Sequence, residues 1–174
     1  MSEPFFTVFT PVYNRRHCLH RVWDSLCAQT DRDFEWIVVD DGSTDGVGEL
    51  LADYRTKADF PMTILSQSNQ GKHFAWNRAV DLAKGYLFVP ADSDDEFVPE
   101  TLERFRALWL SIPPLSRERF SGINVLCRDQ YGEIVGDLFP QDVMTSNNLE
   151  LFYRYNVQGE KWGCLRTDLL RQRK

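Results

Sequence analysis

The chain has 174 residues, of which 43% are hydrophobic and 26% are charged, and its formal net charge is −6. This length suits one domain with a substantial core, and the composition is ordinary for a soluble globular protein. The negative charge argues against a nucleic-acid partner, which needs a basic face. No apolar run approaches the roughly 18 residues that cross a bilayer, so no transmembrane segment is expected.

The N-terminus and the cysteines bear on the cellular compartment. MSEPFFTVFTP has neither a basic region nor a small-residue cleavage site, so a secretory signal is not expected. The four cysteines show no zinc-binding spacing and are interpreted as reduced thiols; they are Cys18, Cys27, Cys127 and Cys164. The sequence therefore predicts a cytoplasmic protein.

The first two thirds of the chain alternate between short apolar runs and amphipathic stretches. The run 34–39 is almost continuously apolar, as expected for a strand that is covered on both faces. Ser43 or Thr44 is expected to cap the helix that follows it. The expected order is strand 5–10, helix 17–29, strand 34–39, helix 46–57, strand 62–65, helix 72–83, strand 86–89 and helix 99–111. This alternation predicts a doubly wound α/β fold with a mostly parallel sheet.

After Pro113-Pro114 the pattern changes. Two strands joined by a glycine-containing turn are expected at 120–128 and 133–137, followed by a short helix at 147–155. A strand at 161–166 and the start of a helix at 168–173 come last. Three tryptophans of the first part, Trp23, Trp36 and Trp76, are expected in the core.

Four polar motifs stand where predicted strands end. They are TPVYNR (10–15), VVDDGSTDG (38–46), SNQGKHFAWNRA (68–79) and VPADSDDEF (89–97). Open parallel sheets bind ligands outside the carboxyl ends of their strands, so two aspartate clusters should meet at one rim. Acidic clusters suit a divalent cation that also binds substrate phosphates. The pattern therefore predicts a phosphate-bearing ligand held through a metal.

The cluster Asp92, Asp94 and Asp95 is the expected metal site, with Asp94 as the firmest ligand. A bare solvated turn is the alternative, although three like charges would then repel one another. Asp40 and Asp41 are expected to contact a base or ribose, with Gly42 allowing a close backbone approach. The alternative for that pair is an ordinary acidic helix N-terminus.

The two remaining motifs offer an aromatic ring and a cation. Tyr13 provides a ring on which a nucleobase can stack, while Thr10 and Pro11 shape the floor of the pocket. Gly71 before a helix and the adjacent Lys72 form a cradle for phosphate or base oxygens. Turn chemistry and an exposed loop are the respective alternatives.

No P-loop, dinucleotide-binding glycine motif or hydrolase nucleophile elbow is present. Together the four motifs, over residues 5–111, resemble the family-2 glycosyltransferases, and FPQDV (139–143) and GEKWGCLRTDLL (159–170) resemble a bacterial subgroup. The resemblance implies a GT-A fold, a Rossmann-like three-layer sandwich. It also implies one domain over 1–174, with a donor-binding half at 1–112 and an incomplete acceptor-side half at 113–174.

The resemblance implies a function in polysaccharide or glycoconjugate synthesis. The enzyme would transfer a sugar from a nucleoside-diphosphate sugar, with a UDP-sugar favoured, to a hydroxyl of a saccharide or lipid-linked acceptor. The reaction would invert the anomeric centre, with Mn²⁺ or Mg²⁺ as cofactor. Nucleotide-sugar binding would fall to Thr10, Pro11, Tyr13, Asp40, Asp41, Lys72 and Asp92, and metal binding to Asp94 and Asp95.

The general base of the family would lie beyond Lys174, which predicts a truncated chain. A full-length form could then work at the inner membrane surface. Two alternatives stay open. One is a non-catalytic fragment that binds a nucleotide or serves as a partner subunit. The other is a sugar-nucleotide nucleotidyltransferase. The motif TPVYNR argues against this class, because it lacks the glycine-rich loop that such enzymes carry.

Overall fold

A computed structural model describes residues 3–172, which form two compact units. The described part of the first unit comprises residues 3–123 and 164–172, and the second unit comprises Asn124–Gly163. Among the described residues no helix is long and apolar enough to cross a membrane.

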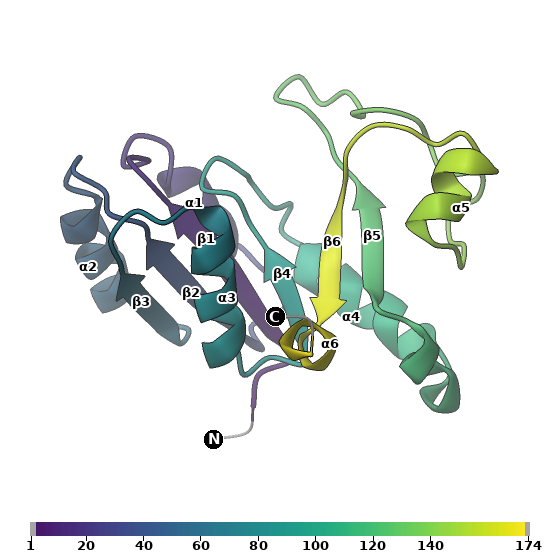
Figure 1. Ribbon diagram of the computed structural model, residues 1–174, viewed down its shortest axis with the longest axis horizontal. Helices are drawn as coiled ribbons and strands as arrows, with labels where there is room; N and C mark the ends of the chain where they lie inside the picture. Colours follow the sequence, from purple (N-terminus) through teal and green to yellow (C-terminus); the bar gives the residue numbers. More distant parts are fainter. Residues whose placement is uncertain (1–2, 173–174) are drawn as a thin grey trace. The chain divides into compact units, whose positions relative to one another are not determined.

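Parallel strands form the centre of the first unit (Figure 1). β1 (Phe6–Val12) pairs in parallel with β2 (Phe34–Asp40) and β4 (Leu87–Pro90), and β2 pairs in parallel with β3 (Met62–Ser66). β6 (Lys161–Arg166) joins β4 in antiparallel orientation, and the full order is β3-β2-β1-β4-β6-β5, with β5 at Gly122–Leu126. The mostly parallel sheet is thus confirmed. Because β1 lies between β2 and β4, the strand order reverses at its carboxyl end, where such sheets bind ligands.

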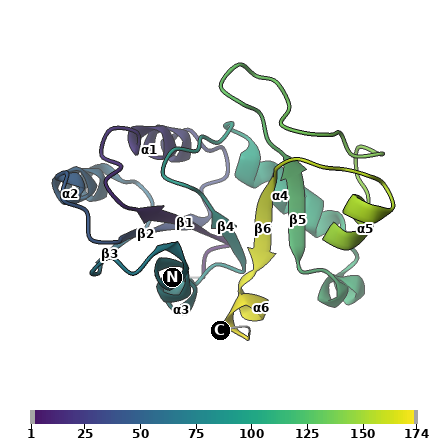
Figure 2. The same cartoon turned by 45° about the horizontal axis from the view of Figure 1, so that its top comes forward.

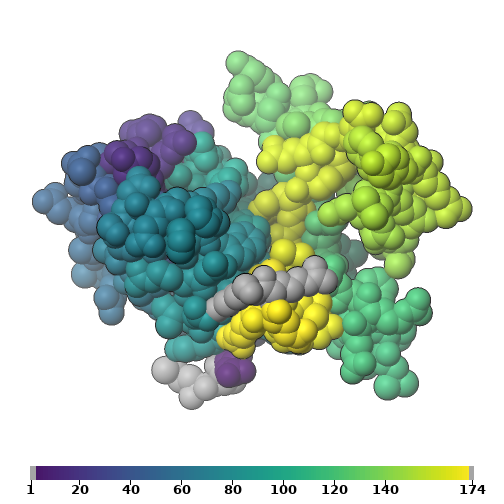
Figure 3. All heavy atoms as spheres, in the orientation of Figure 1, coloured from purple at the N-terminus to yellow at the C-terminus, as the bar shows by residue number. Residues whose placement is uncertain are grey.

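Helices cover both faces of this sheet. In Figure 2, α1 (His20–Cys27) and α2 (Val47–Lys57) lie on one face, and α3 (Lys72–Leu82) lies on the other. α3 is in contact with α6 (Thr167–Arg171), and the two lie beside each other in Figure 3. α4 (Thr101–Ser111) and a 3₁₀ helix, η1 (Pro114–Arg119), follow β4. The three predicted layers of a doubly wound fold are present.

The core explains why the strands read as apolar runs. All seven positions of β2 are buried, as a strand covered on both faces requires. One core cluster joins the strands to α3 and consists of Phe9, Ile37, Val39, Ala75, Ala79, Val80, Ala83 and Phe88. Small alanines on α3 let the helix lie close to the aromatic side chains of β1 and β4. Trp36 is fully buried as predicted, whereas Trp23 and Trp76 are only partly buried.

Two local predictions were wrong. Residues 133–137 form no strand, because the pairing there is limited to one bridge between Arg128 and Ile134. Neither Ser43 nor Thr44 caps α2, which starts after Gly46 in the left-handed conformation without a side-chain cap. The Ser43 hydroxyl instead accepts a hydrogen bond from the backbone N–H of Asn14.

The second unit contains one helix, α5 (Asn148–Tyr153), among its described elements. The side chain of Asn147 caps it by accepting a hydrogen bond from the Glu150 N–H at 3.0 Å. The predicted helix at 147–155 is therefore confirmed, although it is shorter at its end. The predicted helix at 168–173 corresponds to α6, and position 173 lies outside the described residues.

Candidate functional site

The predicted rim forms at the carboxyl ends of β1, β2 and β4. Asp40, the last residue of β2, pairs with Val12, and Pro90, the last residue of β4, pairs with Phe9. β4 therefore ends three positions earlier along β1 than β2 does, which corresponds to roughly 10 Å. The two aspartate clusters follow these two ends, so a bridging group is needed to connect them.

Asp41 is buried and accepts three hydrogen bonds. The Gln67 side chain and the Gln70 N–H donate to Oδ1 at 2.7 and 2.9 Å, and the Gly71 N–H donates to Oδ2 at 2.7 Å. Burial by itself raises the pKa of the Asp41 carboxyl, but these hydrogen bonds outweigh it and hold the pKa below its ordinary value. Asp41 is thus held as an anion at neutral pH, and its hydrogen bonds fix the loop before α3.

Asp40 and Gly42 also serve the local backbone. Asp40 is buried, and its Oδ1 accepts a hydrogen bond from the Ser43 N–H at 2.9 Å. Gly42 has a φ of +82°, and a Cβ at this position would lie 2.8 Å from the backbone nitrogen of Asn69. The close approach that requires this glycine is therefore made by the protein's own loop. The adjacent carboxylates of Asp40 and Asp41 are therefore stabilised by hydrogen bonds from backbone N–H groups of the protein itself.

The start of α3 connects the two acidic clusters. While the N–H of Gly71 holds Asp41, the neighbouring Lys72 places its ammonium 2.5 Å from Oδ1 of Asp92. Both members of this ion pair are about half exposed. Residues that are 20 and 30 positions away from the α3 start thus contact the same short segment, Gly71 and Lys72.

The carboxylates after β4 differ in their contacts. Asp92 is paired with Lys72, and its N–H donates to Oδ2 of Asp95 at 2.9 Å. Asp94 is exposed, and within residues 3–172 no hydrogen bond or ion pair engages its carboxylate. Asp94 is therefore a carboxylate of this turn that an incoming cation can reach without displacing another partner, and the exposed Glu96 lies two residues further on.

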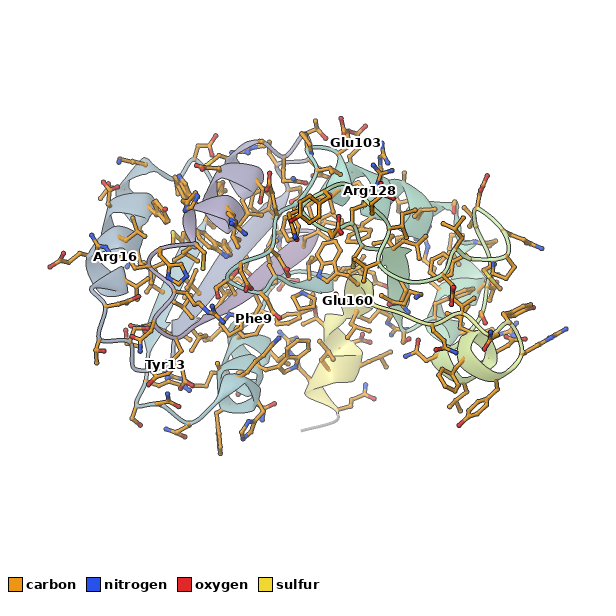
Figure 4. The ribbon with its side chains drawn as sticks, turned by 90° about the horizontal axis from the view of Figure 1, so that it is seen from above. Phe9, Tyr13, Arg16, Glu103, Arg128 and Glu160 are labelled. Atoms are coloured by element: carbon orange, nitrogen blue, oxygen red, sulfur yellow. The ribbon has the colours of Figure 1, made fainter. Side chains whose placement is uncertain are left out.

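The residues at the end of β1 occupy different depths. Thr10 is fully buried, and its hydroxyl accepts a hydrogen bond from the Trp36 indole at 3.0 Å. Pro11 is partly buried and pairs with Val39. Tyr13 is 50% exposed, and it is labelled on the segment that follows β1 in Figure 4. Thr10 and Pro11 thus lie beneath the rim, while the Tyr13 ring is open to a ligand.

Three functional supports were missed by sequence reasoning. Gln67, Gln70 and Ser43 hold Asp41 and the rim loops through contacts across 26 to 29 residues. No local sequence pattern predicts contacts between residues so far apart in the chain. A partial signal existed for Gln70, because it precedes a glycine and a helix N-terminus, where backbone N–H groups face an anion. The anion that they face is Asp41.

The donor set is suited to Mg²⁺ or Mn²⁺, which favour oxygen ligands. Residues 3–172 contain no cluster of three or more acidic, histidine or cysteine side chains arranged to hold a metal by themselves. The exposed carboxylate of Asp94 and the neighbouring Asp95 are oxygen donors of the kind that these ions bind, so the residues present fit such a metal.

Comparison with known proteins identifies the family to which these motifs belong. The model of the family described as "Glycosyl transferase family 2" matches residues 7–148, which is most of the chain. The teichuronic acid biosynthesis glycosyltransferase TuaG of Bacillus subtilis, a putative assignment by its own name, is 32% identical over 102 residues. That match covers 59% of this chain and 40% of TuaG, so the chain spans less than half of this relative.

Solved glycosyltransferases share the fold. S. aureus TarS superposes with a TM-score of 0.69 at 25% identity, covering 99% of this chain and 29% of TarS. Its residues 1–349 in complex with UDP-GlcNAc give a TM-score of 0.64 at 24% identity, over 99% and 47% of the two chains. The mannosyltransferase PcManGT of Pyrobaculum calidifontis, in complex with GDP-Man and Mn²⁺, gives 0.58 at 30% identity over 65% and 34%. The mixed, mostly parallel sheet of this chain is the GT-A fold.

Proposed function

The chain belongs to glycosyl transferase family 2, and from this membership and its rim we propose that it binds a nucleoside-diphosphate sugar there and transfers the sugar to an acceptor hydroxyl. Family membership supports a transferase activity. The observation that carries the proposal is the chain of contacts from Asp41 through Gly71 and Lys72 to Asp92. It joins a buried anion, a cation and an acidic turn at the ligand-binding edge of the sheet.

We propose residues 1–112 as the donor-binding half. Tyr13 would stack on the base, with Thr10 and Pro11 beneath it, and Asp40 and Asp41 would lie beside the base and ribose. Lys72 would leave Asp92 for the diphosphate, since a phosphate carries more charge than one carboxylate. Asp94 and Asp95 would hold Mn²⁺ or Mg²⁺, which when bound stabilises charge on the departing diphosphate.

The remaining acceptor capacity of Asp41 supports UDP over GDP as the donor nucleotide. A carboxylate accepts about four hydrogen bonds, and Oδ1 of Asp41 already takes two while Oδ2 takes one. One site therefore remains. Uracil presents a single N–H donor on its pairing edge, whereas guanine presents an N–H and an amino group together. The single donor matches the single free site.

We propose that the reaction inverts the anomeric centre and builds a polysaccharide or glycoconjugate. The name of TuaG assigns that relative to teichuronic acid biosynthesis, which supports the second part of this proposal. A carboxylate base would deprotonate the acceptor hydroxyl. Glu150 is unsuited to this task, because hydrogen bonds from Ser146 and Arg154 hold the pKa of its carboxyl below the ordinary value. The base would be another group, and the acceptor would be a saccharide or a lipid-linked saccharide.

The first test is a calorimetric titration of UDP and of GDP into the protein, with Mn²⁺, with Mg²⁺ and with EDTA. The proposal expects UDP to bind with Mn²⁺ and to lose most of its affinity in EDTA, because the rim carboxylates repel a diphosphate without a cation. Equal binding of UDP with and without metal would remove the metal from the proposal. Absence of nucleotide binding under all conditions would overturn the donor site.

Binding alone leaves a nucleotide-binding fragment as the second candidate, because the chain spans 40% of TuaG. Release of UDP from UDP-sugars in the presence of oligosaccharide or lipid-linked acceptors separates the two candidates. Acceptor-dependent release supports transfer, and tight UDP binding without any release favours the fragment.

A further inference from the structure

We propose that Asn14 is a positioning residue that holds Tyr13 at the angle required for stacking on the nucleobase. The inference rests on the proposed nucleotide site and assigns a role to a residue outside the predicted binding set. It is drawn from the hydrogen bonds of the loop after β1 and from the absence of contacts to the Tyr13 ring.

The Tyr13 side chain receives no support of its own. Within residues 3–172 no hydrogen bond, ion pair or aromatic contact engages the ring, which is 50% exposed. A half-exposed ring without a hydrogen bond or an aromatic partner samples several rotamers, and ordering it on binding costs free energy. Its direction is therefore set by the backbone on either side, which is Val12 at the end of β1 and Asn14.

Asn14 joins two rim loops in both directions. Its N–H donates to the Ser43 hydroxyl at 2.9 Å, and its Oδ1 accepts from the Thr44 N–H at 2.8 Å. Two residues further, the Arg16 N–H donates to Oδ2 of Asp45 at 2.8 Å. These contacts, which we call the Asn14 clamp, connect residues 14–16 to residues 43–45.

The backbone of Asn14 makes this geometry possible. Its φ of +53° lies in the left-handed region, which asparagine tolerates better than other residues with a Cβ. The turn reverses the chain directly after Tyr13, so the ring is presented between the end of β1 and the loop that follows Asp41. An alanine at position 14 would both disfavour this turn and remove the acceptor for Thr44.

A double-mutant cycle measured by UDP titration with Mn²⁺ tests the role. Tyr13→Ala is expected to weaken UDP about tenfold, as for loss of one base–aromatic stack. Asn14→Ala is expected to weaken UDP about fivefold in the native background, as for loss of one well-supported hydrogen bond. In the Tyr13→Ala background, Asn14→Ala should have no further effect, because the ring that it orients is gone.

Two further variants keep the result interpretable. Asn14→Asp retains both the acceptor oxygen and the tolerance for positive φ, so it should restore affinity to within about twofold of the native protein. Asn156→Ala is the matched control, because Asn156 also has a positive φ, of +52°, and lies in the second unit. It should leave UDP affinity unchanged.

The outcomes distinguish this inference from the proposed function. If the native protein binds UDP and Asn14→Ala binds it equally well, the inference is wrong while the donor site stands. An additive loss in the double mutant would also overturn it, since Asn14 would then act on the rim without Tyr13. If the native protein binds no UDP, the donor site and this inference fall together.

Discussion

The two units of the chain differ in how completely they bury their apolar side chains. In the first unit every position of β2 is buried, and the rim aspartates Asp40 and Asp41 are held by backbone donors. In the second unit Leu151 and Val157 are the buried apolar residues among those described. Its exposed large hydrophobic residues are Tyr131, Ile134, Leu138, Val143, Leu149, Phe152 and Tyr153.

This difference indicates which part of the fold is rigid. A site that must hold carboxylates of like charge near one another needs a support that does not yield, and the buried parallel strands supply it. A segment with few buried apolar contacts opens at low free energy. The proposed donor site is therefore expected to keep its geometry independently of the state of the second unit.

Hydrogen exchange tests this difference in local stability between the two units, and we expect the largest effect in this experiment. Amides of β1 and β2 are expected to exchange at least about a thousandfold more slowly than those of residues 128–160, because the latter open locally. The measurement is native-state exchange read by mass spectrometry. Equal protection in both units would show that the second unit shares the cooperative core of the first.

Asp94→Ala sharpens the assignment of the rim to metal binding. UDP affinity with Mn²⁺ should fall by about a hundredfold or more, because a cation that neutralises a diphosphate would lose its most accessible ligand. The melting temperature should stay near the native value, since no described hydrogen bond or ion pair within residues 3–172 depends on this carboxylate.

The control for that variant is Asp53→Ala, which removes an exposed carboxylate paired with Lys57 on α2. UDP affinity in this control should remain native. A comparable loss in both variants would mean that net charge, and not the position of Asp94, governs binding.

The sheet was predictable because its strands are short apolar runs between glycines, prolines and polar turns. β1 and β2 could be read with small errors at their ends, since burial on both faces leaves a continuous apolar signal. Residues 133–137 were also predicted as a strand, yet they form a single bridge. A run this short does not reveal whether a partner strand lies alongside.

The site was predictable in its location and less so in its supports. Asp94 and Tyr13 stand out because their motifs follow buried strands. The contacts of Gln67 and Asn14 span 26 to 30 residues, and their partners are brought together by strand order, which a single sequence does not encode locally. Gly42 shows the same limit, because the backbone that requires it belongs to Asn69.

Asp41→Asn should destabilise the first unit by about 2 kcal/mol at neutral pH. Both oxygens of the buried carboxylate accept hydrogen bonds from partly buried donors, and the amide would direct an N–H₂ group at one of them. Because the folded pKa of Asp41 is lowered, its stabilisation is present above the unfolded pKa of about 3.9 and is lost as pH falls through the folded pKa.

The free energy of unfolding of the native protein and of Asp41→Asn, measured by urea denaturation, should therefore converge below about pH 4. Asp53→Asn serves as the control, and its difference from the native protein should be small, because the carboxylate is exposed. A gap for Asp41→Asn that stays constant down to pH 2 would show that the hydrogen bonds, and not the ionised form, carry the effect.

Lys72→Met should produce the smallest change in binding affinity, and the direction of that change should differ between UDP and Mn²⁺. With Mn²⁺, UDP should bind about fivefold more weakly, because the diphosphate loses one cation. Without nucleotide, Mn²⁺ alone should bind about twofold more tightly, because Oδ1 of Asp92 is no longer held by the ammonium. Lys57→Met, which removes a similarly exposed ion pair on α2, should change neither quantity.

Opposite shifts in the two titrations would identify Lys72 as a group that exchanges a carboxylate for a phosphate. Parallel shifts would instead assign Lys72 a general electrostatic role.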